Sequence, residues 1–362
     1  ANGAALMEAV VGNPPFMGGR DISERLGEIY NDFLSRLHAT SKVADLVAHF
    51  FRRGRSLAGA HGSLGLIATN TIAEGDTRDA ALKHLLAVGA VVYDAVSAMA
   101  WPGSAAVTVS ILHLAFGRVT ECVGGVRLDG LAVGMVNSLL RAAPERTDPV
   151  RLVANDSCSF LGLKPWGAGF LLSADERQVL VCRDLRNAER IFRYVGGEDI
   201  NSNPLHESSR YAIHFGAMEL EDAERWPDLI DVVRRRVKPE RDRLGDSTDS
   251  RRMKQYWWQY YGRDRPEMRA ALEVLPRCIV SARVTKHLCF SFQSTDRLFS
   301  EQVYLFALGC MSALAVLQSR VHEPWARLLS SSLEDRLRYS ASDCFETFPF
   351  PKPDPRTVLP AL

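Results

Sequence analysis

The stretch Asn13-Pro14-Pro15-Phe16, which ends the apolar run Val10-Val11-Gly12, combines residue types that could hold a planar aromatic amine. The lone pair of such an amine is delocalised into its ring, so the nitrogen is a poor nucleophile. Two hydrogen-bond acceptors that hold both amino hydrogens favour a pyramidal nitrogen, whose lone pair can attack a methyl donor. The amide oxygen of Asn13 is one candidate acceptor, and the carbonyl oxygen of Pro14 is the other.

Proline makes this turn rigid, because its ring fixes φ and it has no N–H. The ring of Phe16 could stack on the base, which must first be flipped out of a duplex at a cost of a few kcal/mol. The chemistry would then rest on positioning and fixed dipoles. The alternative is structural: a Pro-Pro turn that closes a strand, with Asn13 as its cap and Phe16 in a core.

The elements around this motif predict an α/β fold. We expect a short buried strand over residues 4–11, a helix within 42–62 and a strand within 63–72. A second helix over 76–89 and strands within 90–99 and 105–116 would follow. Such alternation is typical of a mostly parallel sheet covered by helices. Because α/β sheets bind ligands at the carboxyl ends of their strands, the position of Asn13 favours a site.

The pattern changes within residues 118–150, where "RAAPERTDP" indicates a domain boundary. Beyond it, turns, short strands and helices alternate without a βαβ rhythm. Residues 278–293 predict a β-hairpin that turns near Lys286 and His287, and residues 300–338 predict helices. We therefore expect two domains, over residues 1–135 and 150–362, the second of α+β type.

Several segments in order resemble one family, the class I adenine-N6 DNA methyltransferases, and in particular the MmeI-type restriction–modification enzymes. The first half of the resemblance lies in "VVGNPPFMGG", "ADLVAHFFRRGRSL", "GSLGLIATNTI" and "AWPGSAAVTVSILHLA". The second half lies in "YVGGEDINSNP", "RVKPERD", "ARVTKH", "LQSRVHEPWAR" and "LRYSASDCFETFPFP". The resemblance covers nearly the whole chain. It implies the C-terminal half of a Rossmann-like methyltransferase sheet followed by an α+β target recognition domain.

The resemblance also implies roles for single residues. Asn13, Pro14 and Phe16, with Pro15 between them, would hold and stack a flipped adenine. Trp101, followed by Pro102, resembles the aromatic step that stacks the other face of the base, where the family usually has Phe. The alternative for Trp101 is a half-buried aromatic at the entrance of a strand.

The cofactor that the resemblance implies is S-adenosylmethionine. The glycine-rich strand–turn–helix that binds it normally comes well before this motif, yet only twelve residues precede Asn13 and no Gly-x-Gly-x-x-Gly occurs in the sequence. We therefore expect a C-terminal fragment, whose donor site is completed by a missing N-terminal region. Alone, it should neither bind the donor nor methylate DNA.

A basic block in the second half predicts a DNA surface. From Arg234 to Arg269 the sequence has twelve Lys and Arg against six Asp and Glu, interleaved with five Tyr and Trp residues at 256–261. Arg234, Arg235, Arg236 and Lys238 are candidates for contacts to backbone phosphates. The alternative is a solvated helix face whose aromatics anchor it, and we expect most of these aromatics in the core.

The predicted hairpin is the candidate for reading bases of double-stranded DNA. A two-stranded ribbon fits the major groove, where Arg can bind a guanine edge. The candidate residues are Arg283, Thr285, Lys286 and His287, with Ser331, Ser332, Arg336 and Arg338 as further phosphate or base contacts. The alternative for each residue is a surface salt bridge.

Other features exclude several classes of protein. The net charge of +1 implies no partner, and no apolar run approaches the ~20 residues that span a bilayer. The seven cysteines include no Cys-x-x-Cys pair, which argues against a disulfide framework and fits a reducing cytoplasm. Together with the nine histidines they form no cluster with the spacing of metal ligands. Ser110 and His113 have no nearby acid, so no hydrolase triad is predicted.

Three functions remain open. The first is a fragment of a site-specific DNA adenine-N6 methyltransferase that acts in restriction–modification or phage defence. The second is a DNA-binding specificity module without catalysis of its own. The third is a methyltransferase that acts on RNA or on a protein amide, since the same tetrapeptide can hold either group.

Overall fold

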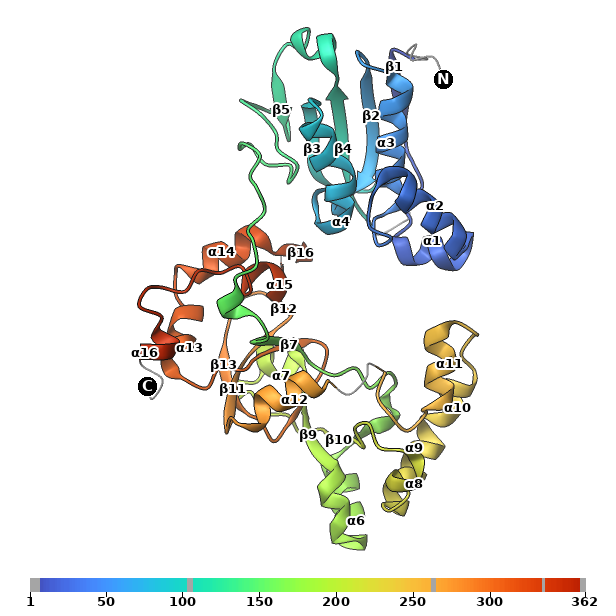
Figure 1. Ribbon diagram of the computed structural model, residues 1–362, viewed down its shortest axis with the longest axis vertical. Helices are drawn as coiled ribbons and strands as arrows, with labels where there is room; N and C mark the ends of the chain where they lie inside the picture. The colour runs from blue at the N-terminus through green and yellow to red at the C-terminus, as the bar shows by residue number, and fades with distance from the viewer. Residues whose placement is uncertain (1–6, 103–106, 262–264, 334–335, 359–362) are drawn as a thin grey trace. The chain divides into compact units, whose positions relative to one another are not determined.

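The computed structural model describes residues 7–102, 107–261, 265–333 and 336–358. The chain forms two compact units, residues 1–148 and 149–362, which are described separately (Figure 1). The first unit is built on a mixed sheet with helices, and the second contains several small sheets with helices between them. The predicted order of an α/β sheet followed by an α+β domain is confirmed.

The sheet of the first unit has six strands in the order β1-β2-β4-β3-β5-β6. Its strands are β1 (Ala9–Gly12), β2 (Ser63–Thr69), β3 (Val91–Ala100), β4 (Thr108–Ala115), β5 (Val126–Leu128) and β6 (Leu131–Val133). Among the described strands of this sheet, only β1–β2 and β3–β5 pair in parallel. The expectation of a mostly parallel sheet was wrong, because the link from β3 to β4 is too short for a crossover helix and forces an antiparallel hairpin.

One face of this sheet carries the core of the unit. The helices are α1 (Gly19–Leu26), α2 (Glu28–His38), α3 (Leu46–Ala58), α4 (Gly75–Arg78) and α5 (His84–Ala87), with a π-helical segment, Asp79–Lys83, between the last two. Leu64, Leu66 and Ala68 alternate along β2 and pack against Val47 and Phe51 of α3. The predicted helices and strands of this region are therefore present.

Strand β1 is more exposed than the sequence predicted. Its residues are exposed except for the half-buried Val10, and Val11 is 83% exposed. The expectation of a buried strand was wrong, because β1 lies at the edge of the described sheet and pairs only with β2.

The segment after β6 packs on the first unit. Val136 and Leu140 enter its core. The guanidinium of Arg78 donates to Ser138 Oγ at 2.9 Å and to Asp148 at 2.8 Å. Residues 136–148, which lie between the two domains expected from the sequence, are thus held by the first unit.

The second unit contains two four-stranded sheets, β14-β9-β10-β8 and β13-β11-β15-β7, and a three-stranded sheet, β12-β17-β16. The bounds are β7 (Ser159–Leu161), β8 (Leu171–Leu172), β9 (Ile191–Val195), β10 (Tyr211–Ile213), β11 (Arg277–Ala282), β12 (Val284–Thr285), β13 (Ser291–Ser294), β14 (Leu298–Phe299), β15 (Val303–Phe306), β16 (Ser331–Leu333) and β17 (Arg336–Arg338).

Helices lie between and around these sheets (Figure 1). They are α6 (Ala174–Arg183), α7 (Gly197–Ser202), α8 (Leu220–Ala223), α9 (Pro227–Arg236), α10 (Lys238–Asp242), α11 (Thr248–Gln255), α12 (Pro266–Glu273), α13 (Met311–Leu317), α14 (His322–Leu329), α15 (Ala341–Cys344) and α16 (Pro355–Val358). The predicted run of helices over 300–338 was only partly right. β15, β16 and β17 are strands, because each finds an antiparallel partner that local sequence does not reveal.

The two ends of the second unit are joined. The buried side chain of Asn155 donates to the carbonyl oxygens of Phe345 and Phe348, at 2.9 Å each, across 190 and 193 residues of sequence. Strand β7 also pairs with β15. The core of this unit is therefore closed by contacts between its first and last segments.

Candidate active site and candidate DNA-binding surface

The motif Asn13–Phe16 directly follows β1. Gly12, the last residue of β1, pairs in parallel with Leu66 of β2, so the motif leaves the sheet at the carboxyl edge of these strands. Pro14 is buried, Phe16 is half-buried, and Asn13 and Pro15 are exposed. Within the described residues, the amide of Asn13 makes no hydrogen bond, so its oxygen is free to accept one from a ligand.

The residue after the motif is fixed by Asp45. The backbone N–H of Met17 donates to Asp45 Oδ1 at 3.2 Å, and the N–H of Leu46 donates to the carbonyl of Met17 at 2.8 Å. Asp45 is also the N-cap of α3, since the same oxygen accepts the N–H of Val47 at 3.0 Å. The loop that carries the motif is thus tied to the start of a buried helix.

Helices α1 and α2 were missed by the sequence analysis, and they hold the other side of this loop. A Cβ atom at Gly19 would overlap the carbonyl oxygen of Lys42, so only glycine permits this approach. The buried Asn31 donates to the carbonyls of Gly19 at 2.9 Å and Lys42 at 3.1 Å. The spacing of Ile22, Leu26, Ile29, Phe33 and Leu37 is the helical signal that could have revealed these two elements.

Trp101 lies at the same edge of the sheet as the motif. It follows the end of β3, where Ala100 pairs with Thr108, while Thr69 at the end of β2 pairs with Val109. Its backbone N–H donates to Val107 at 2.9 Å, and its ring is half-buried. The structure thus brings Trp101 and Asn13, 88 positions apart in sequence, to one end of one sheet.

In the second unit, each member of the basic cluster at 234–238 has a carboxylate partner. Arg234 contacts Glu224 at 3.1 Å, Arg235 contacts Asp231 at 2.9 Å and Lys238 contacts Asp242 at 2.7 Å. Arg236 forms an ion pair with Glu176. These pairs lie at the surface, so a phosphate would have to displace a local carboxylate from each side chain.

The aromatic residues of the same block mostly belong to the core, as the sequence predicted. Trp257, Trp258 and Tyr260 are buried among residues from α9 and β10. Below them lies Arg241, a fully buried arginine that donates to the carbonyl oxygens of Pro165 at 2.9 Å and Tyr256 at 3.0 Å. It also donates to Gln259 at 2.6 Å. Burial lowers the pKa of this guanidinium to about 10.

The predicted hairpin is present, but its connection forms a separate strand. β11 and β13 pair antiparallel, from Arg277↔Ser294 to Val280↔Ser291. Between them, β12 leaves this sheet and pairs with β17, with Val284 opposite Arg338. Two stretches that the sequence offered as independent candidates, 283–287 and 336–338, therefore form one three-stranded sheet with β16.

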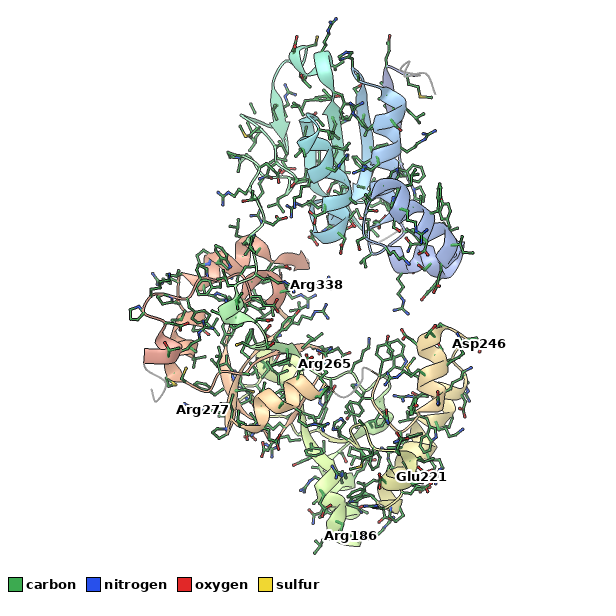
Figure 2. All side chains as sticks on the ribbon, in the orientation of Figure 1. Arg186, Glu221, Asp246, Arg265, Arg277 and Arg338 are labelled. Carbon is green, nitrogen blue, oxygen red and sulfur yellow. The ribbon has the colours of Figure 1, made fainter. Side chains whose placement is uncertain are left out.

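This small sheet presents several basic side chains. Lys286, His287, Arg336 and Arg338 are exposed, and Arg283 is half-buried. The label in Figure 2 marks Arg338. Among the residues that the structure describes, Lys286 and Arg338 make no side-chain ion pair. Unlike the cluster at 234–238, these two positive charges are thus available to a partner.

Three further predicted contact residues are less accessible or not described. The side chain of Thr285 is buried, and its hydroxyl donates to the carbonyl of His287 at 2.6 Å. This hydroxyl therefore holds the turn, and the contact from Thr285 to DNA stays a prediction. Ser331 and Ser332 lie in β16, and their side chains fall outside the described part of the structure.

Two further properties concern metals and membranes. Over the described ranges, no three His, Cys, Asp or Glu side chains come together in a group that could bind a metal ion. None of the helices in those ranges combines the length and the apolar character needed to cross a bilayer.

The strand order of the first unit, with an antiparallel β4 between β2 and β3, and the motif at the end of β1 define a class I methyltransferase sheet. Residues 4–122 match the DNA-methyltransferase domain of MmeI, and residues 157–352 match the MmeI target recognition domain. The chain therefore belongs to the MmeI family.

Two longer proteins resemble the chain over most of its length. DNA methyltransferase A of Bacillus subtilis strain 168 is 20% identical over 357 residues, which are 95% of this chain and 39% of that protein. The type IIL restriction–modification enzyme MmeI, solved in complex with DNA, matches with a TM-score of 0.76 at 18% identity. That match covers 95% of this chain and 46% of MmeI. The chain thus spans less than half the length of either relative.

Proposed function

We propose that the chain is part of a site-specific DNA adenine-N6 methyltransferase that acts in restriction–modification or phage defence. The observation that carries this proposal is the position of Asn13–Phe16 at the carboxyl edge of a methyltransferase sheet, with the Asn13 amide exposed and without a partner among the described residues. Membership of the MmeI family supports both the chemistry and the biological role.

In the proposed reaction, the Asn13 side-chain oxygen and the Pro14 carbonyl oxygen accept the two hydrogens of the adenine amino group. This arrangement localises the lone pair on the nitrogen and directs it toward the methyl donor. Phe16 stacks on one face of the flipped base and Trp101 on the other. The buried ring of Pro14 and the anchor from Met17 to Asp45 hold the acceptors in place.

S-adenosylmethionine would supply the methyl group. The residues present fit the target base better than this donor. The sequence has no glycine-rich phosphate- or donor-binding turn, and β1 has a second edge that no described strand pairs with. We therefore assign no donor contact to the residues of this chain.

Double-stranded DNA is the proposed partner of the second unit. We place the reading surface on β12 and β17, with Lys286, His287, Arg336 and Arg338 toward the DNA and Arg283 behind them. The antiparallel pair β12–β17 is a two-stranded ribbon, the form that fits a major groove. Arg234, Arg235, Arg236 and Lys238 keep a lesser role in the proposal, because carboxylates already neutralise them.

A second candidate function is a DNA-binding specificity module without catalysis. The observation that favours it is the match of residues 157–352, more than half of the chain, to a target recognition domain. The two candidates differ in one respect: only the first requires Asn13.

The test is Asn13→Ala in the enzyme that contains this chain. N6-methyladenine in duplex DNA is measured by mass spectrometry, and DNA affinity by fluorescence anisotropy. We expect methylation to be lost with affinity and melting temperature unchanged, because this side chain is exposed and makes no hydrogen bond within the described residues. Asn13→Asp, which keeps an acceptor of the same size, serves as the conservative variant and should retain a trace of activity. Wild-type turnover in Asn13→Ala would refute the catalytic proposal.

A further inference from the structure

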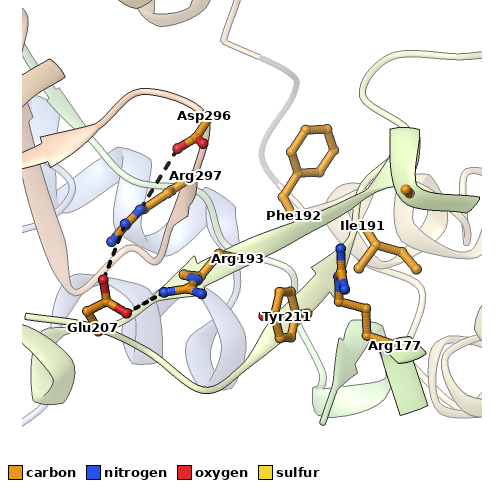
Figure 3. Close-up of a pocket in the computed structure, with 9 residues that line it drawn as sticks. Arg177, Ile191, Phe192, Arg193, Glu207, Tyr211, Asp296 and Arg297 are labelled. Atoms are coloured by element: carbon orange, nitrogen blue, oxygen red, sulfur yellow. Dashed lines mark hydrogen bonds and ion pairs between the residues drawn. The ribbon is translucent and has the colours of Figure 1, made fainter. Parts of the chain in front are cut away.

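A polar pocket opens on the second unit, away from the sheet β12-β17-β16. It has a volume of about 500 Å³ and is lined by residues of α6, β9, β10 and the turn between β13 and β14 (Figure 3). Its charged residues are Arg177, Arg193, Arg297, Glu207 and Asp296. Three guanidinium groups from three separate segments thus meet in one cavity.

Two of these guanidinium groups flank a tyrosine. Arg177 of α6 lies over the Tyr211 ring at 4.9 Å, and Arg193 of β9 lies at 6.0 Å from the same ring centre. Tyr211 and Arg193 are direct cross-strand partners, and Figure 3 shows Tyr211 between the two arginines. Stacking on an aromatic ring fixes the plane of a guanidinium and leaves the N–H groups at its edge for a ligand.

The carboxylates in the pocket neutralise only part of this charge. Glu207 is shared, at 2.5 Å from Arg193 and 3.7 Å from Arg297. Asp296 is exposed and lies 3.9 Å from Arg297. Among the described residues Arg177 contacts no carboxylate, and its Nε is buried without a hydrogen-bond partner. Three positive groups therefore face two negative ones, and Arg177 carries the uncompensated charge.

We infer that this pocket binds a phosphate group, with Arg177 as its principal donor. A phosphate offers several oxygens that can accept from more than one guanidinium, and charge-assisted bonds of this kind are the strongest that arginine makes. The phosphate could belong to the DNA backbone or be a free anion. The DNA source rests on the proposed function, whereas the free-anion source does not.

The first experiment uses inorganic phosphate as the probe. Its binding to the full chain is measured by calorimetry in chloride buffers of constant ionic strength, for the wild type, Arg177→Gln and Arg183→Gln. Arg183 lies on the same helix, is exposed, and pairs with Asp228 outside the pocket, so it is the matched control. We expect Arg177→Gln to weaken binding about tenfold and Arg183→Gln to leave it unchanged. Arg177→Lys, which keeps the charge but loses the planar fork, should fall between them.

The second experiment uses duplex DNA of random sequence. If the pocket holds a backbone phosphate, Arg177→Gln should weaken binding to every duplex and flatten the slope of log K against log salt by about 0.9. Arg183→Gln should leave the slope unchanged. A further measurement on the wild-type chain does not depend on the folding of any variant. Phosphate should slow the modification of Arg177 by phenylglyoxal, as mapped by mass spectrometry.

The outcomes separate the two sources. An effect on phosphate binding with DNA binding unchanged assigns the pocket to a free anion, and an effect on DNA assigns it to the backbone. Either result supports the inference. If the wild-type chain binds no duplex, the proposed function is wrong, and the first experiment still tests whether the pocket binds phosphate. If neither ligand responds to Arg177→Gln and phosphate does not protect Arg177, the inference is overturned.

Discussion

Asp45 accepts the backbone N–H of Met17, at 3.2 Å, with the same carboxylate oxygen that caps helix α3. Its own backbone N–H donates to Thr77 Oγ1 of α4 at 3.1 Å. The side chain of one buried residue thus links the loop of the candidate catalytic motif to α3, and its backbone links it to α4.

The first prediction follows from that link. Asp45→Ala should lower the free energy of unfolding of the first unit by about 1–2 kcal/mol, the usual cost of losing a good N-cap. Asp45→Asn, which keeps a capping oxygen, should lose less. In the enzyme that contains this chain, Asp45→Ala should reduce the methylation rate without changing DNA affinity. Urea unfolding and single-turnover methylation check the two parts. A stable variant with full activity would show that the link does not position the motif.

The second prediction separates the two groups of basic residues. Arg338→Ala should cost about 1–3 kcal/mol on the preferred duplex and relax selectivity at one base pair. Arg235→Ala should change affinity by less than about 0.5 kcal/mol, since its exposed guanidinium already pairs with Asp231.

The measurement for this pair is selection from a duplex library, followed by titrations at several salt concentrations. Both variants should melt at the wild-type temperature because both side chains are exposed. A larger loss of DNA affinity in Arg235→Ala than in Arg338→Ala would show that the cluster at 234–238 is the main DNA-binding surface.

The third prediction concerns pH. His322 is buried against Phe290 and Phe348, its Nε2 lies 3.1 Å from the Tyr339 hydroxyl, and burial lowers its pKa from 6.5 to about 4. Between these values the unfolded chain binds more protons than the folded one. The free energy of unfolding should therefore fall as the pH is lowered through this window, by up to about 3 kcal/mol at its lower end.

His322→Asn does not titrate and isolates this contribution. The difference in unfolding free energy between wild type and variant should shrink as the pH is lowered from about 7 to about 5. Urea unfolding at each pH provides the measurement. A difference that stays constant across the window would mean that His322 has the same pKa in the folded and unfolded chains.

The fourth prediction tests the buried arginine. Arg241→Met keeps the volume but leaves the carbonyls of Pro165, Tyr256 and Gln259 without their donor. It should destabilise the second unit by about 2–4 kcal/mol. Arg243→Met, two residues away and exposed, is the control and should change stability by less than about 0.5 kcal/mol. Equal melting temperatures for the two variants would show that the three carbonyls find other donors.

Local patterns were enough to predict α3 and β2. Helix α3 begins after the capping residue Asp45 and ends at Gly59. Strand β2 is a short run in which small and branched residues alternate. The candidate motif could also be predicted, because its residue types and its place after a strand are both local. Trp101 was predicted only through the resemblance, since its proximity to the motif depends on strand order.

The parts that local sequence could not predict depend on distant partners. Strands β16 and β17 lie within a stretch that reads as helix, and they become strands because β12, about fifty residues earlier, completes their sheet. The ion pairs of Arg234 and Arg236 use Glu224 and Glu176, which no local spacing reveals. The burial of Thr285 likewise depends on a sheet that the hairpin pattern does not contain.

The bonds from Asn155 to Phe345 and Phe348 have a consequence for biosynthesis. A ribosome releases Asn155 and β7 long before their partners exist. Asn155 lacks its acceptors until residue 348 has left the exit tunnel. Strand β7 lacks its partner β15 until residue 306 has left the tunnel. The second unit must therefore fold after nearly all of its residues have been released. The first unit, which spans residues 1–148, can already be folded by then. Nascent chains stalled before residue 345 should expose the second unit to proteases and leave the first protected.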